Sequence, residues 1–238
     1  MISRRFRIAT LLLVVTLASC ASTPEAPVPS ASRVGVVSLL GDTLHTVFVG
    51  ATVFTNENRD APVPDWGLDD QGREHLLSAL RQRGYTAGPI KLGAGGVEAR
   101  YQRDSGPRAE YAGLDVAALR EMGRQQGYTM LVVLSRATPG AGDPHASHMI
   151  PGYGIYRRSV FGAKFSCTYT LADVLRIDVA SGEVVRRGLL PCKGWESGMP
   201  EFQQDYLRYS PSEREILRGK FSQRLQERLD EAFGRIGL

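Results

Sequence analysis

The feature that most constrains the fold is a stretch with a two-residue period at positions 165–177. Its odd-numbered positions are mostly apolar and its even-numbered positions mostly small or polar, with Asp173 as the interruption. Since side chains alternate between the two faces of a β-strand, this pattern predicts one long strand. The Ala-Ser-Gly segment at 180–182 predicts a hairpin turn, and residues 183–190 predict the return strand. The chain is therefore expected to contain an antiparallel meander.

Shorter patterns predict further strands and loops. Apolar or β-rich runs predict strands at residues 34–40, 44–54 and 130–134, the last of them central. Residues 85–92 are expected at a sheet edge, because Pro89 cannot donate a ladder hydrogen bond. Polar or glycine- and proline-rich composition predicts loops at residues 55–66, 93–113 and 137–152.

Two helices are expected in the first half of the chain. Asp69 or Asp70 can cap the first of them, and Asp115 can cap the second, because a carboxylate accepts hydrogen bonds from the free N–H groups of a helix N-terminus. Gly84 and Gly127 follow the last apolar positions and are typical of helix ends.

A third helix closes the chain. Ser210, Pro211 and Glu213 have the spacing of a capping box with proline at the first helical position. One apolar stripe follows, through Leu217, Phe221, Leu225, Leu229, Ala232, Phe233 and Ile236. The order of elements predicts an α+β fold, with a mixed β-sheet and a C-terminal antiparallel meander packed against about three helices.

The N-terminus has the parts of a secretory signal. Three arginines precede an apolar run at residues 8–17, which is shorter than the roughly 20 residues that a membrane-spanning helix needs. The segment Leu17-Ala18-Ser19-Cys20 then resembles the bacterial lipobox. This resemblance implies cleavage before Cys20, a thioether-linked diacylglycerol on its sulfur, and a fatty acid such as palmitate on its new amino group.

The lipobox resemblance also implies how the chain is divided and where it resides. The expected parts are a signal peptide at residues 1–19, the lipidated cysteine and a proline-rich tether at 20–32, and a single periplasmic α+β domain at 33–238. Ala21 stands where an aspartate would resemble the inner-membrane retention signal. We therefore expect the N-terminal lipid to hold the protein in the outer membrane, facing the periplasm.

Charge and sequence motifs exclude several functions. The formal net charge of +4 includes three signal-peptide arginines, so 4 − 3 = +1 remains, which argues against nucleic acid as a partner. His145 and His148 lie near Asp143, but the surrounding prolines and glycines predict a loop rather than a metal-binding helix face. Phosphate-binding loops and the nucleophile elbow are also missing from the sequence. We expect no metal, no cofactor and no enzyme activity.

Two cysteines would remain besides the lipidated one. Cys167 lies on the long strand, within two or three residues of the position opposite Cys192 on the return arm, and a bulge could close that gap. Because the periplasm is oxidising, we expect a disulfide between them. Two buried free thiols are the alternative.

A group of aromatic and basic residues suggests a binding surface. It comprises Tyr153, Tyr156, Arg157, Arg158 and Phe161, with Trp195 farther along the chain. Aromatic faces and arginines can stack on sugars or anchor a protein partner. A strand whose aromatic residues are divided between core and surface would produce the same pattern.

Three segments resemble uncharacterised proteobacterial outer-membrane lipoproteins. They are RVGVVSLLGDTLHTVFVGATVF and VPDWGLD between residues 33 and 70, GYGIYRRSVFG at 152–162, and VLRIDVASGEVV at 174–185. That family carries no established catalytic role. In architecture alone, the order of strands and helices is also similar to the periplasmic domains of curli-secretion-type lipoproteins and to the N-terminal domain of TolB.

These observations favour a non-catalytic cell-envelope lipoprotein that binds or assembles with another envelope protein. One alternative is a lipoprotein that binds a small ligand or glycan through the loops near Tyr153 and Trp195. The other is a hydrolase that acts on envelope polymers.

Overall fold

The computed structural model describes residues 32–101, 113–137, 148–189, 192–195 and 197–238. The signal peptide, Cys20, nearly all of the tether, Asp143 and His145 lie outside these residues. Within the described part, no helix is both long and apolar enough to cross a membrane.

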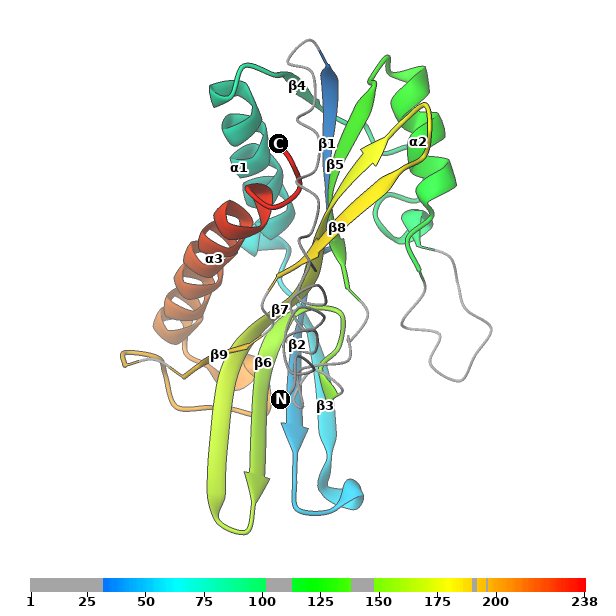
Figure 1. Ribbon diagram of the computed structural model, residues 1–238. Coiled ribbons are helices and arrows are strands. Elements are labelled where there is room, and N and C mark those ends of the chain that lie inside the picture. Colours follow the sequence, from blue (N-terminus) through cyan, green and yellow to red (C-terminus); the bar gives the residue numbers. More distant parts are fainter. Residues whose placement is uncertain (1–31, 102–112, 138–147, 190–191, 196) are drawn as a thin grey trace, which may run out of the picture.

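Among the described residues, nine strands form one mixed sheet in the order β3-β2-β6-β7-β5-β1-β4, and β8 and β9 pair with β7 outside this path (Figure 1). The strands are β1 Arg33–Leu39, β2 Thr43–Val49, β3 Glu57–Pro62, β4 Thr86–Pro89, β5 Met130–Arg136, β6 Gly152–Val160, β7 Ala163–Asp178, β8 Val184–Gly188 and β9 Cys192–Gly194. Strands β1 with β4, β1 with β5 and β2 with β6 are parallel, and the other pairs are antiparallel.

Three α-helices cover the two faces of this sheet. They are α1 Leu68–Gln82, α2 Val116–Gln125 and α3 Pro211–Phe233. Helices α1 and α3 lie side by side on one face, and α2 packs against the other (Figure 1). The predicted α+β fold, a mixed sheet with a C-terminal meander and about three helices, is confirmed.

Strand β7 joins the two halves of the sheet. Its first half pairs with β6 and β9, and its second half pairs with β5 and β8, so the predicted long strand and its return hairpin are confirmed. Both faces of β7 are buried from Cys167 to Ile177. The even-numbered face, which carries the small residues Thr168, Thr170 and Ala172, is buried as well, because α1 and α3 cover that side of the sheet.

Two of the three predicted helix N-caps are confirmed. Ser210 and Glu213 form the predicted capping box of α3, and the carboxylate of Asp115 accepts a hydrogen bond from the backbone N–H of Ala118 at 2.9 Å. The predicted cap of α1 is wrong, because Gly67 occupies that position with φ of 61°. The carboxylate of Asp69 instead accepts hydrogen bonds from the turn that joins β1 to β2.

The prediction of a loop at residues 55–66 is also wrong. Strand β3 occupies part of this segment and pairs antiparallel with β2 at the edge of the sheet. Its sequence, Glu-Asn-Arg-Asp-Ala-Pro, has low β propensity. The strand forms because its backbone completes the ladder of β2, while its charged side chains protect the exposed edge.

The predicted disulfide between Cys167 and Cys192 is present, with a Cα–Cα distance of 5.8 Å. Tyr169 is the residue opposite Cys192, so Cys167 lies two positions away, as the hairpin predicted. The predicted bulge is not needed. Strands β8 and β9 pair with β7 in the same register, since Ile177 faces Val184 and Tyr169 faces Cys192. The disulfide is a diagonal link across a regular ladder.

Candidate functional site

Four of the residues predicted as a binding surface lie on β6, divided between its two faces. Tyr153 is 1% exposed and packs between Trp66 and Phe221 beneath α1 and α3. Tyr156 is equally buried but lies on the opposite face, in the cluster around the disulfide. Alternation along the strand places half-buried Arg158 on this second face as well. The structure therefore does not bring the predicted residues together on one surface.

Arg157 and Trp195 do share a neighbour, Phe202. The Arg157 guanidinium lies 4.3 Å from the ring centre of Phe202, and its Nε donates a hydrogen bond to the Ser166 hydroxyl at 2.8 Å. The Trp195 ring meets Phe202 edge-on, and its Nε1 donates to the carbonyl oxygen of Pro200. These contacts pack the segment before α3 against the sheet, which is a structural role.

A histidine of the sheet and a histidine of α1 each form a pair with an acidic side chain. His45 contacts Asp60 at 2.7 Å, and His75 contacts Asp230 at the same distance. The hydrogen bond from His45 holds the pKa of Asp60 below its usual value. Among the described residues, no three His, Cys, Asp or Glu side chains gather closely enough to hold a metal ion.

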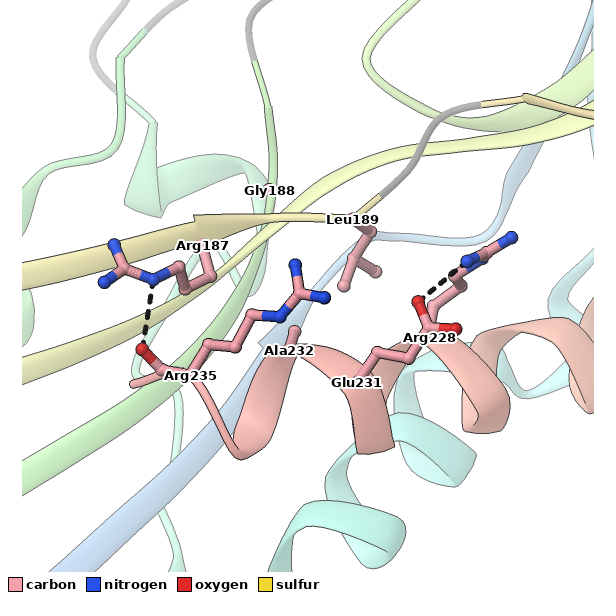
Figure 2. A pocket seen from close by; sticks show the side chains of 7 residues that line it. All are labelled: Arg187, Gly188, Leu189, Arg228, Glu231, Ala232 and Arg235. Carbon is pink, nitrogen blue, oxygen red and sulfur yellow. Dashed lines mark hydrogen bonds and ion pairs between the residues drawn. The ribbon is translucent and has the colours of Figure 1, made fainter. Parts of the chain in front are cut away.

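A small arginine-lined pocket lies between β8 and the last turns of α3 (Figure 2). Its volume of about 60 Å³ is well below the roughly 300 Å³ at the lower end of small-molecule sites. Arg187 donates from Nε to the carbonyl oxygen of Arg235, and Arg228 forms an ion pair with Glu231 at 2.7 Å. The size and these contacts do not favour binding of a sugar or a metabolite here.

The most exposed apolar side chains lie at the turns of two neighbouring hairpins. Phe54 is 94% exposed in the connection between β2 and β3, and Phe161 is 96% exposed in the turn between β6 and β7. Strands β2 and β6 are parallel neighbours, with Val49 beside Arg158, so both turns project from the same end of the molecule (Figure 1). We call residues 50–56 and 160–163 the hairpin tips.

Phe161 has an unusual backbone conformation. Val160 pairs with Ala163, and the two residues of the turn, Phe161 and Gly162, have φ angles of 49° and 83°. Positive φ at both central residues is the arrangement of a type I′ turn, which strongly prefers Asn-Gly. A bulky side chain is strained in this left-handed region, so Phe161 lowers the stability of the turn while its phenyl ring is exposed to solvent.

The β6–β7 hairpin contains no acidic residue near its tip, whereas the β2–β3 hairpin carries Glu57 and Asp60 on β3. Residues 43–56 have no Asp, Glu, Lys or Arg, and residues 152–172 have three basic residues and no acidic one. Lys164 is exposed and Arg158 half-buried on the strands directly behind the β6–β7 turn. Behind the β2–β3 tip, Glu57 and Asp60 are paired with Arg59 and His45. Both tips therefore carry an exposed phenyl ring, and the β6–β7 tip has basic residues just behind it.

Comparison with known proteins gives no functional assignment. No protein-family model matches the chain, and no curated protein matches it. The hypothetical protein CT253 from Chlamydia trachomatis is similar with a TM-score of 0.30 and 11% identity, over 87% of this chain and 96% of that one. Lipoprotein GNA1162 from Neisseria meningitidis gives 0.26 and 12%, over 83% and 99%. Scores this low carry no argument, so the function is inferred from the geometry.

Proposed function

We propose that this protein is a cell-envelope lipoprotein, anchored in the outer membrane through lipids on Cys20 and facing the periplasm. Its folded part is a non-catalytic module that binds another envelope component through the hairpin tips. The observation that carries the proposal is the pair of almost fully exposed phenylalanines at one end of the molecule. Contact with a partner or a membrane would remove these two phenyl rings from water, which is favourable for apolar groups.

Two further observations support an envelope location. The lipobox-like segment before Cys20 is the sequence pattern of lipid attachment. The Cys167–Cys192 disulfide is typical of proteins that fold in an oxidising compartment. Neither observation identifies the bound component, so the tips are the part to test.

Labelling and crosslinking in cells test this function. We expect a palmitate analogue to label the wild-type protein and not the Cys20→Ser variant. We also expect a photoreactive amino acid at position 54 or 161 to give a crosslinked product, while the same group at exposed Val184, at the opposite end of β7, gives none. Label retained on Cys20→Ser contradicts lipid attachment at that residue. Equal crosslinking from all three positions contradicts a binding role for the tips.

A further inference from the structure

We infer that the component bound by the hairpin tips is the interface of an anionic phospholipid bilayer, into which Phe54 and Phe161 insert. This inference rests on the proposed binding function of the tips and names their partner. It follows from three features of the tips: the apolar side chains, the sign of the nearby charge, and the strained turn.

The two exposed phenyl rings stand on separate narrow turns and do not form a continuous apolar surface. Phe161 stands on a two-residue turn and Phe54 on a 3₁₀ helix of three residues, each at the end of a narrow hairpin. A stable protein interface usually involves roughly 20–30 residues on each side, far more than these tips provide. An isolated ring on a narrow turn suits insertion between lipid headgroups, where the ring is surrounded by acyl chains.

The charge near the tips complements an anionic membrane. Arg158 precedes Phe161 by three residues on β6 and Lys164 follows it by three on β7, at the depth where lipid phosphates would lie. Basic residues next to a bilayer are attracted to anionic headgroups, whereas acidic residues would be repelled. Residues 152–172 contain no Asp or Glu, so this repulsion is absent at the β6–β7 tip. At the β2–β3 tip, Glu57 and Asp60 are paired with Arg59 and His45, which reduces the repulsion there.

The turn between β6 and β7 would be more stable with a residue other than phenylalanine at position 161. Asparagine would suit the φ of 49° better than phenylalanine. Phe161→Asn therefore separates folding from binding. It should leave the melting temperature unchanged or raise it, while removing the inserting group.

Vesicle flotation tests the inference directly. The probe is the chain from residue 20 to 238 with Cys20→Ser, so that no acyl chain contributes to binding. We expect it to float with vesicles of phosphatidylethanolamine and phosphatidylglycerol, and more weakly with phosphatidylcholine alone. Phe161→Asn and Phe54→Ser should each lower partitioning about tenfold or more, as loss of one buried phenyl ring predicts. Lys164→Glu should weaken binding to the anionic vesicles only.

Val184→Ser is the control, because Val184 is 38% exposed and pairs with Ile177 at the end of β7 that lies farthest from the tips. It should bind vesicles as the parent does. The inference is overturned if the parent binds neither kind of vesicle, or if Phe161→Asn binds as tightly as the parent. Crosslinks from position 161 to a protein, without vesicle binding, would overturn the membrane as partner and leave the proposed binding function intact.

Discussion

Asp69 links two elements through one buried carboxyl group. The carboxylate accepts a hydrogen bond from the Ser38 hydroxyl and, at 2.8 Å each, from the backbone N–H groups of Leu40 and Gly41. Because Asp69 lies in the first turn of α1, these bonds fix the helix to the turn between β1 and β2. Burial raises the pKa of this carboxyl group above its usual value, and the hydrogen bonds oppose that shift only in part.

The raised pKa of Asp69 predicts a pH-dependent stability. In the unfolded chain this group loses its proton near pH 3.8, whereas the folded protein retains it to higher pH. Its favourable contribution is therefore present below about pH 4 and is lost as the pH rises through the folded pKa. We expect the free energy of unfolding of the wild type, relative to Asp69→Asn, to fall as the pH rises above about 4.

Urea unfolding at several pH values measures this difference. The pKa of Asp173 is also raised by burial, but Asp173 is present in both proteins and its effect cancels. A difference that is constant across the range, or that grows with pH, would show that the pKa of Asp69 is not raised.

The disulfide gives a second prediction at the residue scale. Replacing both Cys167 and Cys192 by alanine should lower the free energy of unfolding by about 3 kcal/mol, since the link restricts the unfolded chain. Thermal melts with and without reductant provide the measurement. The wild type should respond to the reductant and the double variant should not. Alkylation of both wild-type cysteines without prior reduction would show that the bond is absent.

At the scale of elements, α3 is held by its apolar stripe. Six of its residues on this stripe are buried: Leu217, Phe221, Leu225, Leu229, Ala232 and Phe233. They pack in the same core as the buried leucines of α1 and the inward face of β1, β5 and β6. The sequence prediction that this stripe is core is confirmed.

Leu225→Asp should destabilise the protein by several kcal/mol, because Leu225 is 2% exposed and the new carboxylate would have no partner. Gln226→Asp is the matched control, since it adds the same group to the exposed side of the same helix. Thermal melts should show a large fall in melting temperature for the first variant alone. Equal melting temperatures would contradict the packing of α3.

In the β6–β7 hairpin, unlike in α3, a single substitution should increase stability. A non-glycine residue in the left-handed region costs roughly 1–2 kcal/mol, and asparagine tolerates this region best. We expect Phe161→Asn to raise the free energy of unfolding by about 1 kcal/mol. Phe54→Asn is the control: it lies in a 3₁₀ helix, where φ is negative, and should bring no such gain.

The elements predicted correctly from sequence are those whose signals are local. The alternation along β7, the capping box at Ser210 and the proline at the end of β4 depend on near neighbours in the chain. Strand β3 was missed because its pairing with β2 comes from tertiary structure and not from its own residues. The Asp69 cap was missed for a similar reason, since its acceptor role is decided by a turn about thirty residues away in sequence.

The candidate site was only partly predictable. Tyr153 and Tyr156 are aromatic like Phe161, and the sequence does not show which rings are buried. Phe161 belongs to the aromatic and basic group in the sequence, whereas Phe54 stands apart from it. One signal could have separated Phe161 from the others: it precedes Gly162 at the centre of a two-residue hairpin turn, where asparagine is usual.

At the scale of the whole molecule, the start of β1 and the hairpin tips lie at opposite ends. Val34 pairs with Met130, and Met130 pairs with Asp178, the last residue of β7. The sixteen residues of β7 span about 50 Å at roughly 3.3 Å per residue. The tether at residues 20–32 can reach at most about 45 Å. An upright molecule on the proposed anchor would therefore point its tips away from the anchoring membrane.

The continuity of β7 has a mechanical consequence. If the lipid end and the tips were held by different structures, tension between them would act along the strands. The ladder hydrogen bonds of β7 with β5 and β6 lie across that direction, so they would carry the load together in shear and would not open one after another. The diagonal disulfide near the tips adds a covalent link to the same strand. The fold should therefore resist extension along the direction of its strands.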